Sequence, residues 1–377
     1  MAYRSTFVPS SASGRIPGLD GLRAASIVLV LLGHLAGTRN FLTLASFAPL
    51  GDLGNLGVSV FFVISGYLIT TLLLNEQARD GRVNLGAFYA RRAWRILPAA
   101  GTYLAVLALV ASVTSGARLS SSDWLHALTF TMNYHQERDW WVGHLWSLSV
   151  EEQFYLLWPA AVGVLGRVGG LWLAGSAVVI APVWRVFVWV LWPDARGGLG
   201  ETFPTVMDAI AVGCVLAGSA SWLVDRAWYR WILRPRPLAV IVGVVLGCNA
   251  LARHPWFFLP FGMTLRSVGI ALIVHAAILQ SNQPVASLLD RAGLRWLGRM
   301  SYSLYLWQQP FLNRHSHSTL AAFPVNLGGA FVCAILSFVW IEAPALRLRD
   351  RLGSLRHMVT NLRAPEGTPP DPLSLAR

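Results

Sequence analysis

Long apolar runs, separated by short polar or Arg-rich stretches, follow one another along nearly the whole chain. A helix needs about 20 apolar residues to cross the hydrocarbon core of a bilayer. Because a segment in lipid must satisfy its own backbone hydrogen bonds, we predict that these runs are transmembrane helices. The ten predicted segments are residues 22–38, 55–74, 96–113, 145–165, 169–192, 204–222, 237–252, 264–281, 300–313 and 325–345.

The composition supports this pattern and excludes a soluble domain. Of the 377 residues, 55% are hydrophobic and 13% are charged, and the mean hydropathy is +0.51. These values predict an all-α, polytopic membrane protein with its membrane domain at 21–346. We expect a cytoplasmic segment at 1–20, and an Arg-rich then Pro-rich cytoplasmic tail at 347–377. We expect neither a cleavable signal peptide nor a fused extracytoplasmic domain.

The positive charge follows the membrane pattern and does not indicate nucleic-acid binding. All 30 basic residues are Arg, the formal net charge is +12, and the charges fall mostly between apolar runs. With the N-terminus in the cytoplasm, 22 Arg lie on the cytoplasmic side and six on the other, and two lie in or beside apolar runs. This asymmetry predicts an N-in, C-in protein that crosses a plasma membrane several times. The absence of Lys suggests a GC-rich, bacterial genome.

The cysteines carry no sign of a metal site or a disulfide. Cys214, Cys248 and Cys333 lie far apart in sequence, each within an apolar run. We therefore expect neither a metal cluster nor a disulfide.

Two ionisable residues stand out in the first apolar run. Arg23 and His34 are eleven residues apart, so on a helix they would lie about 20° apart in azimuth and roughly 16 Å apart along the axis. Ionisable residues inside a membrane are usually functional. A neutral imidazole can act as a general base near pH 7, and Arg23 could hold an anionic group. Asp20 could orient the Arg23 side chain or could cap the helix. The structural alternatives are an Arg that reaches the lipid phosphates and a His hydrogen-bonded to a neighbouring helix.

The second and third runs carry two further candidate groups. Ser65, within GVSVFFVISGYLIT, could bind a thioester, although close helix packing also explains the small residues of this segment. Arg91, Arg92 and Arg95 in FYARRAWRILP could bind the phosphates of a cytosolic donor. The positive-inside bias would explain two of these three residues without a ligand.

Two carboxylates adjoin each other in HLWSLSVEEQFYLLWP. Adjacent residues of a helix face different ways, and Tyr155 lies one turn beyond Glu151, so we favour Glu151 as the residue that faces a shared cavity. The alternative is a structural ion pair of Glu151 with Arg185 or Arg266.

Aromatic residues supply the remaining candidates. Several residues of GRMSYSLYLWQQP could line a cavity, although helix packing explains most of this segment. They are Ser301, Tyr302, Tyr305, Trp307 and Gln308. In the outer loop from 115 to 143, Trp124, Trp140 and Trp141 are either interfacial anchors or part of a lid. The other histidines, His144 among them, are weaker candidates.

Taken together, the order and spacing of these motifs resemble the acyltransferase family 3 membrane proteins, which include O-antigen and exopolysaccharide O-acetyltransferases and macrolide acyltransferases. The resemblance implies transfer of an acyl group, expected to be acetyl, from cytosolic acyl-CoA to a hydroxyl of a cell-surface glycan, a lipid-linked sugar or a secondary metabolite. It implies that His34 is essential and that Arg23 is its partner. The residues expected to bind CoA or to match other recurrent family positions are Arg91, Arg92, Arg95, Ser65, Glu151 and Gln153.

Two positions depart from the family pattern. Gln308 stands where many relatives have His, and Ser59 stands where a carboxylate is common. Some relatives carry a fused extracytoplasmic esterase-like domain that completes the transfer. For this chain, a separate extracytoplasmic transferase could therefore be a partner that completes it. In our mechanistic hypothesis His34 acts as a base or as an acyl carrier, and Glu151 orients it. The competing hypothesis is a transporter or flippase of lipid-linked glycans, which would move its substrate without consuming acyl-CoA.

Overall fold

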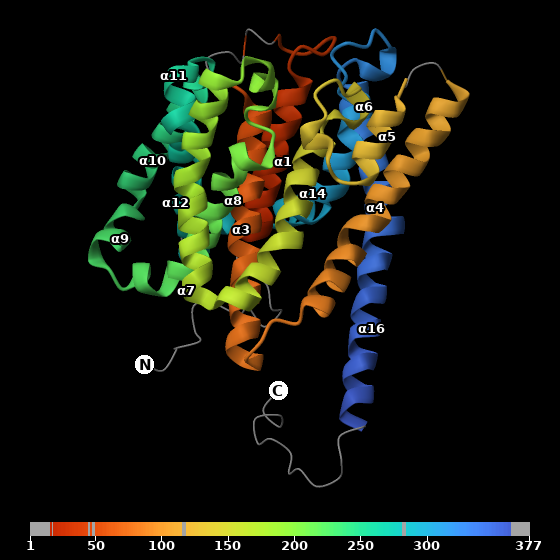
Figure 1. Cartoon of the computed structure of the whole chain (residues 1–377). Coiled ribbons are helices and arrows are strands. Elements are labelled where there is room, and N and C mark those ends of the chain that lie inside the picture. Colours follow the sequence, from red (N-terminus) through yellow and green to blue (C-terminus); the bar gives the residue numbers. More distant parts are fainter. Residues whose placement is uncertain are drawn as a thin grey trace.

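The computed structural model describes residues 16, 18–43, 46, 50–114, 118–280 and 284–362, with the backbone alone for 284–286 and 353–362. The described residues are mostly helical and contain no strand, so the predicted all-α class is confirmed. The longer helices are α1 (Leu19–Leu35), α3 (Leu53–Asp80), α4 (Leu85–Val113), α7 (Leu145–Leu191), α8 (Phe203–Val224), α10 (Pro235–Ala250), α12 (Met263–Leu279), α14 (Ala292–Phe311), α15 (Val325–Ser337) and α16 (Ala343–Leu362) (Figure 1). Shorter helices in the connections are α5 (Ser121–Leu128), α6 (Trp140–Gly143), α9 (Ala227–Ile232), α11 (Pro255–Phe257) and α13 (Pro284–Leu289).

Seven helices of the described chain are long and apolar enough to cross a membrane. The fourth and fifth predicted segments are two helices that share the label α7. They meet at Gly166, where the backbone leaves the helical conformation (φ 66°). The ten-span count and the N-in, C-in orientation stay predictions.

The Arg-rich segment before the third predicted span is part of a helix and not of a loop. The side chain of Asn84 accepts a hydrogen bond from the Ala87 amide at 3.0 Å and so caps α4, which begins eleven residues before the predicted span. Arg91, Arg92 and Arg95 therefore project from a regular helix. The Arg-rich part of the tail is likewise helical, in α16, whereas residues 363–377 lie outside the described residues.

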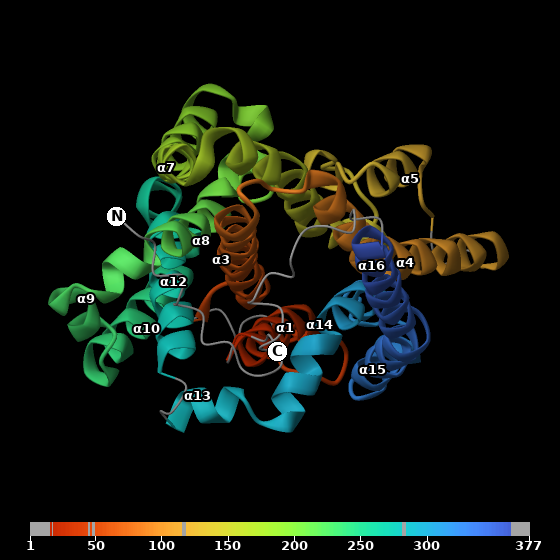
Figure 2. The same ribbon diagram turned by 90° about the horizontal axis from the view of Figure 1, so that it is seen from below.

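Three helices, α1, α3 and α14, lie in the middle of the bundle when it is seen from below (Figure 2). Glycines let these helices pack closely against their neighbours, because a Cβ added at some of the glycines would overlap the backbone of the next helix. A Cβ on Gly57 of α3 would lie 2.5 Å from the Ser26 carbonyl oxygen, and one on Gly66 would lie 2.0 Å from that of Ile210. Close packing, the structural interpretation of these two glycines, is confirmed.

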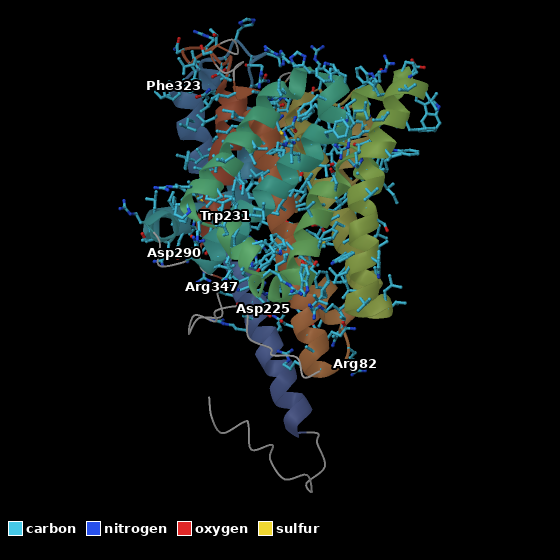
Figure 3. The ribbon with its side chains drawn as sticks, turned by 90° about the vertical axis from the view of Figure 1, so that its left-hand side faces the viewer. Arg82, Asp225, Trp231, Asp290, Phe323 and Arg347 are labelled. Carbon is cyan, nitrogen blue, oxygen red and sulfur yellow. The ribbon has the colours of Figure 1, made fainter. Side chains whose placement is uncertain are left out.

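We expect the connections around 75–95, 223–236 and 282–299 on the cytoplasmic side, and residues from all three lie toward one end of the bundle. Figure 3 shows Arg82, Asp225, Asp290 and Arg347 toward the lower end, whereas Phe323 lies at the upper end. Large apolar side chains cover the periphery between the two ends, and Val183 on α7, for example, is 65% exposed. The molecule therefore has two polar ends joined by an apolar belt.

Candidate active site

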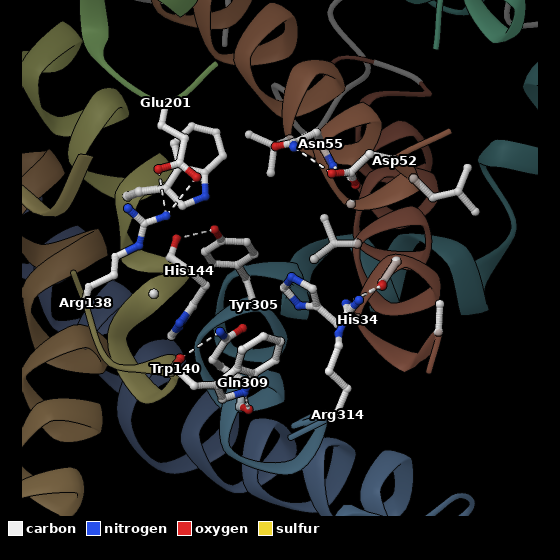
Figure 4. Close-up of a pocket in the computed structure, with 18 of the residues that line it drawn as sticks. His34, Asp52, Asn55, Arg138, Trp140, His144, Glu201, Tyr305, Gln309 and Arg314 are labelled. Carbon is white, nitrogen blue, oxygen red and sulfur yellow. Dashed lines mark hydrogen bonds and ion pairs between the residues drawn. The ribbon is translucent and has the colours of Figure 1, made fainter. Parts of the chain in front are cut away.

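His34 lines a cavity of about 550 Å³ at the upper end of the bundle, here called the outer cavity (Figure 4). Its walls come from α1, the start of α3, the α6 segment, the first turn of α7 and α14. Polar and aromatic side chains predominate around the imidazole. They include Asp52, Asn55, Arg138, Trp140, His144, Glu201, Tyr305, Gln309 and Arg314.

A directed chain of hydrogen bonds fixes the His34 ring. The Trp140 carbonyl can only accept, so it takes a hydrogen bond from Gln309 Nε2 at 2.7 Å. Gln309 Oε1 then accepts from Gln308 Nε2 at 3.2 Å, which turns Gln308 Oε1 toward His34 Nδ1 at 2.6 Å. Nδ1 must therefore donate, and Nε2 carries the lone pair, as a general base requires. Among the described residues His34 Nε2 has no hydrogen-bond partner.

A smaller cavity of about 80 Å³, the inner cavity, lies farther down the bundle and contains most of the predicted polar residues. Arg23 lines it, and its Nη1 lies 3.8 Å from Asp20 Oδ1, so the expected orienting contact is present. Ser65 Oγ donates to Glu151 Oε1 at 2.7 Å and accepts from the Tyr155 hydroxyl at 3.0 Å. Glu151 and Tyr155 thus share a face, as predicted, with Ser65 bridging them.

Below the inner cavity, a pocket of about 480 Å³ is lined by the basic face of α4 and by Arg349 of α16. Arg92 and Arg95 line both this basic pocket and the inner cavity. The Arg92 guanidinium lies 3.5 Å from the centre of the Tyr155 ring, and Arg95 Nη1 lies 3.5 Å from Glu342 Oε1. Arg91 is half exposed and lies 3.3 Å from Glu76.

The inner and outer cavities meet at two side chains, Val58 and Tyr305, which line both. The Tyr305 hydroxyl donates to the His144 carbonyl at 2.6 Å and lies 2.6 Å from Ser147 Oγ. Arg23 and His34 lie at the two ends of α1, on either side of this junction. The basic pocket, the inner cavity and the outer cavity therefore follow one another along the bundle.

The structure corrects several sequence predictions. Glu151 does not orient His34, because it lines the inner cavity and bonds Ser65, while His34 bonds Gln308. The alternative ion pair is also wrong, because Arg185 pairs with Asp208 and Arg266 bonds neutral groups.

Two candidate residues have partners away from both cavities. Gln153 Nε2 donates to Asn133 Oδ1 and to the Phe130 carbonyl, both at 2.9 Å, so it holds the outer loop in place. Trp307 packs edge-on against Tyr103, with ring centres 5.4 Å apart. Neither side chain lines the inner or the outer cavity. In contrast, Tyr302 lines the inner cavity and donates to the Ile96 carbonyl at 3.0 Å.

Sequence reasoning underrated His144, whereas Tyr305, a predicted cavity residue, lines both the inner and the outer cavity. His144 is 3% exposed and lines the outer cavity together with His34, and neither of its ring nitrogens makes a hydrogen bond within the described part of the chain. A signal was present, because seven residues separate His144 from Glu151, which places them within about 20° on one helical face. The Gln308 contact could not be inferred, since it depends on how α1 and α14 pack.

The outer loop contributes directly to the site. Trp140 lines the outer cavity, its ring centre lies 5.9 Å from that of His34, and its Nε1 donates to the Gln309 carbonyl at 2.8 Å. The loop is anchored through Asp123, which accepts hydrogen bonds from Ser120 and from the Asp139 amide. Burial alone would raise the pKa of Asp123, but these bonds and the adjacent His135 bring it below its ordinary value. For Trp140, the lid interpretation therefore fits better than a simple interfacial anchor.

These features define an integral membrane protein with a row of cavities in its helix bundle and an oriented histidine in the outer cavity. The family described as an acyltransferase domain matches residues 16–342. The chain therefore belongs to this membrane acyltransferase family.

Several bacterial proteins resemble the chain. It is 26% identical over 367 residues to the peptidoglycan O-acetyltransferase OatA of Listeria monocytogenes, covering 87% of this chain and 55% of that protein. It is 29% identical over 328 residues to YrhL of Bacillus subtilis, provisionally named a peptidoglycan O-acetyltransferase, covering 79% and 48%. A provisionally named O-acetyltransferase of Staphylococcus aureus strain COL is 28% identical over 375 residues, covering 87% and 57%. The chain thus spans about half the length of these relatives, and no solved structure matches it.

Proposed function

We propose that the chain transfers an acyl group, expected to be acetyl, from cytosolic acyl-CoA to a hydroxyl on the side of the membrane where the outer cavity lies. One observation carries this proposal: the Arg-lined inner cavity and the cavity of His34 meet at Val58 and Tyr305. A donor that enters at one end can thereby reach a base at the other. The plasma membrane of a bacterium is the expected location, given the relatives.

The donor end suits the phosphates of acyl-CoA. Arg91, Arg92 and Arg95 on α4 line the basic pocket together with Arg79 and Arg349. Each of these guanidinium groups except that of Arg92 forms an ion pair with one carboxylate among the described residues. Guanidinium groups bind phosphate oxygens in a fork, and helix α4 holds the three Arg in a fixed arrangement. The thioester arm would then extend past Arg23 and Tyr302 toward the junction.

The acceptor end suits a hydroxyl-rich molecule. Carboxylate, amide and guanidinium groups surround the outer cavity, and Arg138 Nη2 lies 2.7 Å from Glu201 Oε2. Trp140 and Trp146 add aromatic faces. Because two relatives carry names in peptidoglycan O-acetylation, a cell-surface glycan is the favoured acceptor class. A lipid-linked sugar and a secondary metabolite are the alternatives, and a separate extracytoplasmic transferase could complete delivery.

The proposed reaction uses His34 Nε2 as the base. This nitrogen takes the proton of the acceptor hydroxyl as the oxygen attacks the thioester carbonyl; the carbon–sulfur bond then breaks, and CoA leaves as a thiolate that becomes protonated. In the alternative route His34 Nε2 attacks the thioester and carries the acyl group to the hydroxyl. In both routes the hydrogen bond from Nδ1 to Gln308 keeps the reacting lone pair on Nε2.

Purified protein should release CoA from acetyl-CoA only as it acetylates an added glycan acceptor. Released thiol and acetylated glycan, measured by mass spectrometry, should appear in equal amounts. A flippase would move a labelled glycan lipid across proteoliposomes with no release of thiol. That result would replace the enzyme assignment with the transporter hypothesis.

Replacing Gln308 with Leu should lower the turnover number about 10-fold to 100-fold, a part of what a positioned base contributes. Leu cannot accept from His34 Nδ1, so the imidazole loses the bond that fixes its tautomer. Gln308→Glu retains an acceptor oxygen and should keep most of the activity. If both variants fold and lose activity equally, the acceptor role of Gln308 is wrong.

A further inference from the structure

A third cavity, of about 320 Å³, adjoins the outer cavity and has no part in the transfer described above. It lies between α3, α7, α8 and α12, and we call it the Arg266 pocket. Arg266 of α12 lines it together with apolar and aromatic side chains that include Phe62 and Phe258. The wall that it shares with the outer cavity consists of Asp52, Asn55, Val58 and Trp146.

The charge of Arg266 lacks a carboxylate partner. The side chain is 4% exposed, its Nη1 donates to Asn249 Oδ1 and its Nη2 donates to Ser59 Oγ, each at 2.8 Å. Both acceptors are neutral, and the buried Nε has no partner. None of the ion pairs among the described residues includes Arg266. A buried charge without a counter-charge is costly, so this site is incomplete in electrostatic terms.

A second buried guanidinium nearby shows the opposite arrangement. Arg185 of α7 is fully buried and forms an ion pair with Asp208. It also donates to Thr264 Oγ1 and to the Leu259 carbonyl. Asp208 lines the Arg266 pocket, but its carboxylate already binds Arg185 and Thr264. The protein thus gives one buried Arg a carboxylate partner. In the described part of the chain, its neighbour Arg266 contacts two neutral oxygens and lies 5.2 Å from the centre of the Phe258 ring.

The other charged and aromatic groups of the pocket indicate where a ligand would enter. Arg196 and Trp189 line it, and Trp189 is 36% exposed. The Arg196 guanidinium lies 4.6 Å from the centre of the Trp189 ring and donates to the Trp189 carbonyl at 2.8 Å. Tryptophan is typical of the boundary between hydrocarbon and headgroups. The carboxylate of Asp52 caps α3 by accepting from the Asn55 amide. The lining of the pocket thus contains a second guanidinium and a tryptophan ring typical of the headgroup boundary, next to the carboxylates of Asp52 and Asp208.

We propose that the Arg266 pocket binds the phosphate group of an amphiphilic molecule from the adjacent leaflet. The guanidinium supplies the counter-charge and donors for the phosphate oxygens, and the apolar walls cover the carbon chain next to it. Because the pocket shares a wall with the outer cavity, an acceptor held by its phosphate would extend toward His34. That last step rests on the proposed function, whereas phosphate binding itself does not.

The test uses the full chain, purified in a maltoside detergent without phosphate. Inorganic phosphate and a short-chain phosphatidic acid are added separately, with chloride of equal ionic strength as the control. The thermal midpoint should rise to a saturating value with a phosphate compound and not with chloride. A response to inorganic phosphate identifies the group alone as the ligand, and a response only to the lipid shows that the chain is also required. Both outcomes support the pocket.

Position 59 offers a matched pair of variants. Ser59→Asp places a carboxylate against Arg266 and should weaken the apparent affinity for the phosphate compound at least tenfold. Ser59→Asn has nearly the same shape without the charge and should respond like the wild type. If Ser59→Asp does not fold, Arg266→Gln and Arg266→Lys replace the pair, with the response lost in the first and retained in the second. No rise in the wild type, or an equal rise in Ser59→Asp, would overturn the proposal.

Discussion

Replacing His34 with Ala should reduce acyl transfer by about 10²-fold to 10⁴-fold, which is what a positioned general base contributes. The loss should appear in the turnover number. Binding of acyl-CoA should change little, because the guanidinium groups expected to bind it line the basic pocket and the inner cavity. The measurement is acetylated product formed per molecule of folded protein, with the KM for acetyl-CoA determined in parallel.

The matched control is His126→Ala. His126 lies in the outer loop, with Nδ1 2.7 Å from Thr131 Oγ1 and its ring stacked on His135, and it lines neither the inner nor the outer cavity. This variant should retain near wild-type turnover. A folded His34→Ala protein with full activity would remove His34 from the mechanism. A stoichiometric acyl label on the wild-type protein in the absence of acceptor would identify an acyl carrier, and its absence would favour a base.

Replacing Gly298 with Ala should destabilise the protein and lower its activity more than any other Gly→Ala change on α14. A Cβ at Gly298 would lie 1.8 Å from the carbonyl oxygen of Asp20, so α14 would have to move away from α1. Overpacking of this kind typically costs about 1–3 kcal/mol. The shift would also pull Gln308 and Tyr305, which lie on α14, away from His34. Thermal midpoints of the purified variants measure the loss of stability, and the turnover number measures the loss of activity.

Gly293 provides the comparison on the same helix. No atom lies within 4 Å of the position that its Cβ would take, and Ala has a higher helix propensity than Gly. Gly293→Ala should therefore be neutral or slightly stabilising. Equal stability of the Gly298→Ala and Gly293→Ala proteins would show that the close contact between α1 and α14 does not limit stability.

The apolar runs predicted the helices well because a transmembrane helix must satisfy its backbone locally. The separate positions of Arg23 and His34 also followed from local geometry, since they lie at the two ends of one helix and line different cavities. Helix starts were less predictable: Asn84 caps α4 well before the apolar run begins, because an Arg-rich segment can be helical without being apolar.

Contacts between side chains of different helices could not be predicted from the sequence. Glu151 and His34 are both polar residues in membrane helices, and nothing local shows that they line different cavities. The same limit applies to Gln308, whose partner is 274 positions away. Gln153 matches a recurrent family position, but its side chain bonds Asn133 of the outer loop and lines neither the inner nor the outer cavity.

The narrow inner cavity bears on how the membrane stays sealed. A passage that joined two aqueous compartments would dissipate the proton gradient of the cell. In this protein the inner cavity, of about 80 Å³, lies between the larger outer cavity and the basic pocket. Tyr305, where the inner and outer cavities meet, is held by the His144 carbonyl and by Ser147. Three guanidinium groups line the inner cavity, and each repels a cation at 4 Å by about 4 kcal/mol at an effective dielectric constant of about 20. Glu151 also lines this cavity, but three guanidinium groups outnumber its one carboxylate. If the cavity admits an anionic thioester donor, as proposed, the same excess of positive charge should oppose the passage of protons and sodium ions.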